Sequence, residues 1–98
     1  QSESYALSIY HTASKMLAGG SIGSESSLGK IFWSELDHMM HQTALKILGA
    51  SAELSQESQD DAARWIKGFM FSYAGPIYAG TNEIQKNIIA ERLLGLPR

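Results

Sequence analysis

The segment LGKIFWSELDHMMHQTALKIL, residues 28–48, decides the fold class of this chain. Its apolar side chains recur every three or four residues, at Leu28, Ile31, Phe32, Leu36, Met39, Met40, Ala44, Ile47 and Leu48. This spacing places them on one face of an α-helix. Ser24 is a predicted cap for the first N–H groups, and Gly49 stands where a left-handed residue ends a helix. We expect a helix of about 25 residues, about 37 Å long.

Two neighbouring segments show the same period. Residues 4–18 form one apolar stripe, made of Ala6, Ile9, Tyr10, Ala13, Met16 and Leu17. Residues 62–73 form another, made of Ala62, Trp65, Ile66, Phe69, Met70 and Tyr73. Asp60 and Asp61 precede the second stripe, where acidic groups favour the positive end of a helix dipole. A polar surface loop is predicted between residues 50 and 61.

A fourth helix is predicted after Gly75-Pro76, because proline donates no N–H and disfavours helix in the residue before it. Either Thr81 or Asn82 is a suitable cap, and Asn82 with Gln85 has the spacing of a capping box. The apolar residues that follow spread around the helix, which indicates contact with two surfaces. No segment alternates with period two. The fold class is therefore all-α, an up-and-down bundle of about four helices that folds as one compact unit.

The composition excludes several classes of protein. The 98 residues are 44% hydrophobic and 18% charged, with a net charge of −2 and no cysteine. Nucleic acid is not an expected partner, because no basic stripe is available to neutralise phosphates. No apolar run approaches the ~20 residues of a membrane span, so a soluble, cytoplasmic protein is expected. The chain opens on Gln1 inside a periodic pattern, which suggests a piece of a longer protein.

Several side chains suggest sites but have simpler interpretations. His38 and His41, with Asp37, are interpreted as a solvated helical face, because no third ligand stands at a fixed spacing. Glu35 is either a buried acid with a raised pKa or a residue at the edge of the stripe. Aromatic side chains at helical spacing are interpreted as core or interface, and the methionines as gap-fillers. No metal site is expected.

The turn Gly80-Thr81-Asn82-Glu83 differs from these, because the first turn of a helix presents unpaired N–H groups and a positive dipole. A phosphate or another anion fits such a position. The alternative is a helix cap with no further role.

Three stretches resemble the C-terminal helical domain of the flavin-dependent acyl-CoA dehydrogenases. YAGTNEIQKNIIAERLLGLP, Tyr78 to Pro97, is similar to the family signature of Gly-Thr, a Glu-Ile-Gln triplet and a terminal Leu-Gly-Leu-Pro. GKIFWSELDHMMHQTALKILG, Gly29 to Gly49, resembles the long helix of that domain, and ALSIYHTASKMLAGG the helix before it. The resemblance covers most of the chain, so that residues 1–98 are expected to be this domain in part, without the upstream domains.

The resemblance implies oxidation of an acyl-CoA to the 2,3-enoyl-CoA with FAD as cofactor. A carboxylate removes the proton next to the thioester carbonyl while hydride passes from the neighbouring carbon to the flavin. It also implies an acyl-CoA substrate, other subunits in a homo- or hetero-tetramer, and an electron-transfer flavoprotein as partner. The location implied is cytoplasmic, or the mitochondrial matrix in a eukaryote. The 98 residues alone are expected to be inactive.

By this resemblance Thr81, Asn82 and Glu83 contact FAD, and Tyr78 and Gly80 border the acyl thioester. A second flavin segment, Gln-x-x-Gly-Gly in the family, corresponds to Lys46, Gly49 and Ala50. Here the chain departs from the pattern, because Lys46 replaces the glutamine and Ala50 a glycine.

The catalytic base is the larger departure. Many family members carry it as a glutamate directly before Gly-Thr, where this chain has Ala79, which accepts no proton. Three explanations stay open: the base lies upstream, a non-identical subunit supplies the competent site, or dehydrogenation has been lost. The rival from another class is a helical interaction module without enzymatic ancestry.

Overall fold

The described part of the chain is helical throughout. A computed structural model describes residues 2–50, 52 and 61–97. It contains α1 (Ser2–Leu17), α2 (Glu25–Leu48), α4 (Asp61–Ser72) and α5 (Asn82–Ile88), which continues into the π-helical turn η1 (Ile89–Leu93). These residues include no strand, and the predicted all-α class is confirmed. The loop predicted for residues 50–61, with Asp60, lies mostly outside the described residues.

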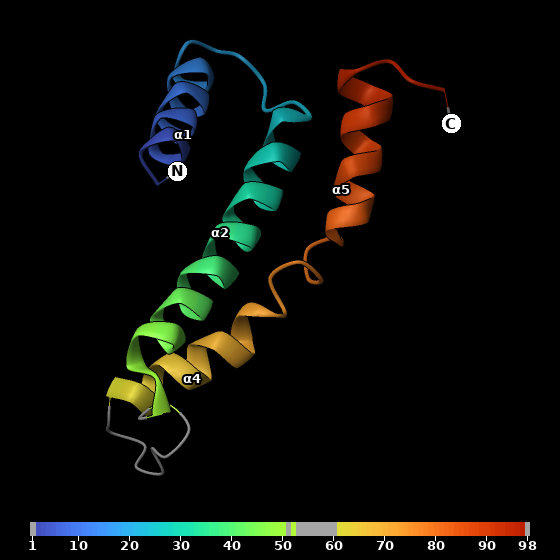
Figure 1. The fold of residues 1–98 in the computed structure, drawn as a ribbon. Helices are drawn as coiled ribbons and strands as arrows, with labels where there is room; N and C mark the ends of the chain where they lie inside the picture. Colours follow the sequence, from blue (N-terminus) through green and yellow to red (C-terminus); the bar gives the residue numbers. More distant parts are fainter. Residues whose placement is uncertain (1, 51, 53–60, 98) are drawn as a thin grey trace.

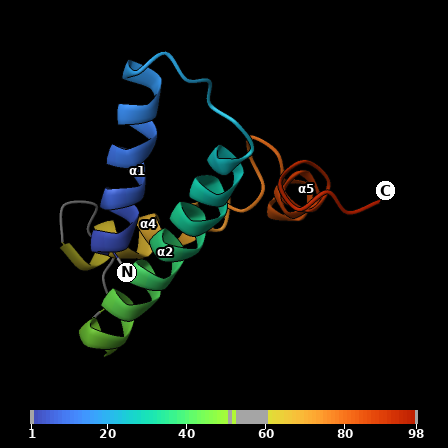
Figure 2. The same cartoon turned by 90° about the horizontal axis from the view of Figure 1, so that it is seen from above.

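Helix α2 is the axis of the structure. Figure 1 shows α1 beside its N-terminal half, α4 crossing its C-terminal half, and α5 running beside its N-terminal half. Seen from above, α1 and α5 lie on opposite sides of α2 (Figure 2). Both outer helices therefore depend on α2 for their position.

The helix ends agree with the predicted positions, but one predicted cap is wrong. Gly49 closes α2 with a positive φ of 56°, and its N–H donates to the Leu45 carbonyl. Ser24 occupies the N-cap position without a side-chain hydrogen bond. Its backbone is helical, with φ −64° and ψ −7°, whereas a capping oxygen needs an extended backbone to reach the next N–H groups.

The capping box predicted at Asn82 and Gln85 is also wrong. Thr81 is the N-cap, and its Oγ1 accepts a hydrogen bond of 3.3 Å from the Ile84 N–H. Asn82 is the first residue inside the helix, where its side chain is buried. Gln85 Nε2 donates instead to the Ala79 carbonyl at 3.1 Å.

Small and polar residues make the interior of the described chain. The side chains below one-tenth exposure are those of Ser27, Ser34, Ala52, Ala62, Ser72 and Asn82. Gly75 belongs to the same contact, because a Cβ on it would lie 3.3 Å from the Ser34 Cβ. Small side chains let the backbones of α2 and the α4 end approach each other closely.

The predicted apolar stripes are largely uncovered. Leu17 is 91% exposed, Ile47 is 81% exposed and Tyr10 is 70% exposed, and α1 has no buried residue. The methionines, interpreted from the sequence as gap-fillers, lie on the surface: Met16, Met39, Met40 and Met70. The stripes are present at the predicted positions, but the described residues cover them only in part: Phe32 and Phe69 are half-buried, whereas most stripe residues of α1 are exposed.

The predicted single compact unit is therefore wrong. The radius of gyration is 17.1 Å, whereas about 13 Å is typical of a compact domain of this length. The accessible surface is 7329 Å², against roughly 5,500 Å² for a compact protein of this mass. Many large apolar side chains of the described residues are exposed, and large exposed apolar patches usually mark contact with other protein. Separately, no described helix has both the length and the apolar character that crossing a membrane requires.

Candidate functional site

The candidate site is the turn that joins α4 to α5, residues 73–81. Its backbone folds back on itself, with the Gly75 N–H on the Ser72 carbonyl at 3.1 Å and the Tyr78 N–H on the Ala74 carbonyl at 3.0 Å. The Asn82 N–H then closes the turn on the Pro76 carbonyl at 2.9 Å. The turn is thus held by its own hydrogen bonds.

Two successive left-handed residues reverse the chain. Ala79 has φ 55° and Gly80 has φ 85°. Glycine suits this region of φ, and a Cβ on Gly80 would also lie 2.7 Å from Gln85 Nε2. Ala79 adopts the same region at a cost, since its Cβ crowds the backbone there. Gln85 stabilises this geometry through its bond to the Ala79 carbonyl.

The turn faces outward. Tyr78, Ala79, Gly80 and Glu83 are exposed, and Thr81 is half-buried. The Tyr78 ring packs beside Trp33 of α2, with 6.1 Å between ring centroids. The exposed backbone of the turn therefore lies next to two aromatic rings, those of Tyr78 and Trp33.

Asn82 differs from its neighbours because its side chain faces inward. Asn82 is 4% exposed. Its Oδ1 lies 2.7 Å from Lys30 Nζ, and its Nδ2 lies 3.1 Å from Ser34 Oγ. Sequence reasoning assigned Asn82 to the cofactor and gave Lys30 no role. One pattern in the sequence could have indicated this contact: Lys30 and Ser34 are one helical turn apart, and both lie beside the apolar stripe.

The second predicted segment, Lys46, Gly49 and Ala50, is exposed at the C-terminal end of α2. At 1.5 Å per residue, Lys46 stands about 18 Å along the helix from Ser34, which contacts Asn82. The structure does not bring this segment to the turn.

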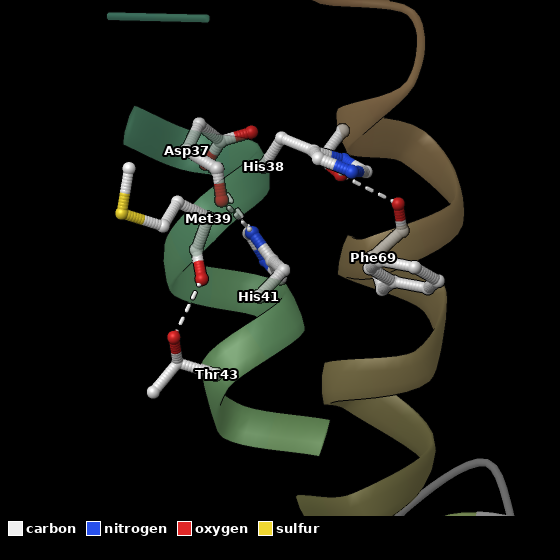
Figure 3. Close-up of polar contacts among 7 residues, drawn as sticks. Asp37, His38, Met39, His41, Thr43 and Phe69 are labelled. Carbon is white, nitrogen blue, oxygen red and sulfur yellow. Dashed lines mark hydrogen bonds and ion pairs between the residues drawn. The ribbon is translucent and has the colours of Figure 1, made fainter. Parts of the chain in front are cut away.

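His38 does not lie on a solvated face, as the sequence had suggested. It reaches across to α4 (Figure 3), where its Nδ1 lies 2.9 Å from Ser72 Oγ. Its ring packs on Phe69 and Tyr73, at centroid distances of 5.4 and 4.5 Å. The Ser72 hydroxyl donates its one hydrogen to the Phe69 carbonyl at 2.6 Å, so the His38 Nδ1–H must be the donor to Ser72.

His41 likewise faces α4. Its Nδ1 donates to the Asp37 carbonyl at 2.9 Å (Figure 3), and its ring packs on Trp65 with 5.4 Å between centroids. Its Nε2 lies against Gly68, where a Cβ would collide with it. Among the described residues, no three histidine, cysteine or acidic side chains gather as a metal site would need. Glu35 is exposed, so the buried-acid interpretation is wrong.

Comparison with known proteins agrees with the motif at the turn. Residues 1–94 match the family model described as acyl-CoA dehydrogenase, C-terminal domain. The chain is 35% identical over 74 residues to acyl-CoA dehydrogenase IpdE1 of Mycobacterium tuberculosis (strain ATCC 25618 / H37Rv). It is 36% identical over 74 residues to acyl-CoA dehydrogenase IpdE1 of Mycolicibacterium smegmatis (strain ATCC 700084 / mc(2)155).

The match covers 76% of this chain, but 19% and 18% of those two relatives, so the chain spans about a fifth of their length. No solved structure matches it significantly. The family model covers nearly the whole chain, including the turn and both helices that hold it. The chain belongs to the acyl-CoA dehydrogenase family, in which it corresponds to the C-terminal domain.

Proposed function

We propose that this chain is the C-terminal helical portion of a longer FAD-dependent acyl-CoA dehydrogenase, which oxidises an acyl-CoA to the 2,3-enoyl-CoA. The observation that carries the proposal is the exposure of Tyr78, Ala79 and Gly80 in the turn and of Glu83 directly after it. The family's Gly-Thr motif stands at this turn, and the turn is open to a ligand or to another part of the protein.

The residues of the turn suit different parts of that site. FAD supplies the hydride acceptor when it is bound. Thr81 and Glu83 stand at the first turn of α5 and offer their backbone N–H groups to the cofactor; Glu83 is exposed and Thr81 is half-buried. The Asn82 side chain, in contrast, faces inward. Tyr78 and Gly80 border the thioester, since the Tyr78 ring is exposed and Gly80 has no side chain to obstruct the approach.

The second flavin segment contacts a part of FAD other than the part at the turn. It consists of Lys46, Gly49 and Ala50. Because Lys46 lies about 18 Å along α2 from the contact with Asn82, and Gly49 lies farther still, one flavin ring system does not touch both segments. We assign this exposed segment to FAD bound with an adjacent subunit. The uncovered apolar surface supports such an assembly, as a homo- or hetero-tetramer.

Ala79 leaves the family's usual base position without a carboxylate, and its side chain is exposed rather than packed. Proton abstraction therefore depends on a carboxylate supplied from elsewhere than position 79: one upstream in the same protein, or one in a non-identical subunit. The third possibility is that the protein has lost dehydrogenation. An electron-transfer flavoprotein is the proposed acceptor, and the proposed location is cytoplasmic, or the mitochondrial matrix in a eukaryote.

The test is to purify the full-length protein and measure bound FAD and acyl-CoA oxidation with an artificial electron acceptor. We expect stoichiometric flavin that acyl-CoA bleaches. If an upstream Glu→Gln variant abolishes turnover and Ala79→Glu leaves it unchanged, the base is upstream and the paired-subunit explanation fails. Flavin that acyl-CoA does not bleach, whether alone or with candidate partner subunits, indicates lost dehydrogenation.

An interaction module without enzymatic activity is the second candidate, favoured by the large apolar surface. Its signature in the same experiment is a full-length protein that binds neither FAD nor acyl-CoA. That result would refute the enzymatic proposal.

A further inference from the structure

The start of α5 is held to the rest of the chain mainly by polar contacts. Apolar side chains of α5 and the segment after it are largely uncovered, with Ile84 51% exposed and Leu94 65% exposed. Asn82, in contrast, is 4% exposed, against Lys30 and Ser34 of α2. Asn82 is the buried residue of α5, so its side chain is a main determinant of where the helix starts relative to α2, beside the Trp33–Tyr78 and Ser34–Gly75 contacts.

The hydrogen bonds around Asn82 have one consistent direction. Ser34 Oγ lies 3.0 Å from the Ile31 carbonyl, 3.1 Å from Asn82 Nδ2 and 3.2 Å from Asn82 Oδ1. A hydroxyl has a single hydrogen, and the shorter contact gives it to Ile31. Ser34 then accepts from Asn82 Nδ2, so Asn82 Oδ1 receives its hydrogen from Lys30.

The Lys30 contact is the strongest of the set. It is 2.7 Å long, and the donor is an ammonium in a half-buried position. Hydrogen bonds from a charged donor are roughly twice as strong as those between neutral groups. Removing the ammonium leaves the oxygen of a buried amide without its main donor, and a buried acceptor without a donor is costly.

Asn82 transmits this contact to the turn. Its side chain is fixed to α2, while its backbone N–H is bonded to the Pro76 carbonyl at 2.9 Å. The loop closed by that bond contains Ala79 and Gly80, whose left-handed backbone sets the direction of the exposed atoms. The beginning of α5 lies beside α2 (Figure 1), and Lys30 of α2 reaches Asn82 there.

We propose that Lys30 is a positioning residue that acts through Asn82 and fixes the cofactor-facing turn against α2. The inference rests on the proposed function and deepens it. Neither side chain needs to touch the flavin, because Asn82 is buried and both polar atoms of its side chain have a hydrogen-bond partner on α2, while the backbone beyond it is exposed. Asn82 therefore moves from the predicted set of direct cofactor contacts to the group that holds them in place.

The test measures FAD affinity of the full-length apoprotein by quenching of flavin fluorescence, alongside urea unfolding without FAD. Lys30→Met keeps the aliphatic stem and removes the ammonium. We expect FAD affinity to fall about tenfold to a hundredfold, the range for losing a hydrogen bond from a charged group. Lys67→Met, on the exposed face of α4, is the matched control and leaves the affinity within about threefold.

Asn82→Asp separates positioning from direct contact. The aspartate keeps an oxygen for Lys30, and its second oxygen accepts from the Ser34 hydroxyl once that hydroxyl turns away from the Ile31 carbonyl. Positioning therefore predicts an FAD affinity within about threefold of the original. Direct contact of the Asn82 amide with a flavin phosphate predicts a large loss, because the new carboxylate repels it. Asn82→Leu, which removes both bonds, should lower the affinity as much as Lys30→Met.

Two results overturn the inference. One is a folded Lys30→Met protein that is less stable to urea yet binds FAD as tightly as the original, since Lys30 is then structural only. The other is a large loss of affinity in Asn82→Asp, which decides the question even if Lys30→Met does not fold. An original protein that binds no FAD refutes the proposed function instead, and the two failures are thereby distinguished.

Discussion

Replacing Ala79 with glycine should stabilise the protein, although the reverse is true at most alanines in this chain. Ala79 has φ 55°, in the left-handed region, and its side chain is exposed. A Cβ in that region costs about 1–2 kcal/mol. Little burial is lost when the methyl group is removed, because it contacts solvent.

The gain is partly offset in the unfolded state. Glycine has more backbone freedom there than alanine, which costs about 0.4–1 kcal/mol on folding. The net stabilisation expected for Ala79→Gly is therefore about 0.5–1 kcal/mol. For a domain of this size such a change raises the melting temperature by roughly 2–8 °C.

Urea unfolding followed by far-UV circular dichroism measures the effect, and the slope against urea should not change. Ala13→Gly is the matched control, because Ala13 is equally exposed but lies inside α1. That variant should lose about 1 kcal/mol through helix propensity alone. If Ala79→Gly destabilises the protein as much as Ala13→Gly does, the left-handed strain assigned to the turn does not exist.

Three further predictions concern the contacts of α2. Gly68→Ala should destabilise the protein by about 1–3 kcal/mol in urea unfolding, because the new Cβ meets the His41 ring. In a His41→Ala background the same substitution should become stabilising. A stabilising effect with His41 present would contradict the contact. Ser72→Ala should lower the free energy of unfolding by about 1–3 kcal/mol, since it leaves the His38 Nδ1–H without an acceptor. Ser8→Ala, at an exposed serine, should change it by no more than about 0.5 kcal/mol. Equal effects of the two substitutions would exclude the His38–Ser72 bond. The Lys15 ammonium, 2.9 Å away, and backbone N–H groups near the start of α2 hold the pKa of the Glu25 carboxyl below its ordinary value. The pair therefore stabilises the fold above that ordinary value, and the contribution is lost as pH falls through the lowered pKa. An NMR titration should show the Glu25 pKa rise toward its ordinary value in Lys15→Met, and an unchanged pKa would refute the pairing.

The helices themselves were predictable from local pattern. Apolar spacing of three and four residues located α1, α2, α4 and α5 to within about two residues, and glycine and proline marked their ends. The left-handed conformation at Gly49 followed from the same reasoning. Helix geometry depends on the nearest four residues of the chain, so a single sequence contains the information for it.

The faces of those helices were not predictable in the same way. His38 was assigned to solvent and is packed on Ser72, 34 residues away. Asn82 was assigned to the cofactor and is buried on Lys30, 52 residues away. The apolar stripes were assigned to a core and are mostly exposed within this chain.

The sequence by itself thus determined which residues are helical, where the turn lies, and which family the motif at the turn resembles. Only the tertiary structure decided that the turn faces outward, that Asn82 faces inward, and that Lys30 holds it. The physical reason is range: periodicity follows from bonds within one helix, whereas burial and hydrogen-bond partners depend on segments that meet only when the chain folds.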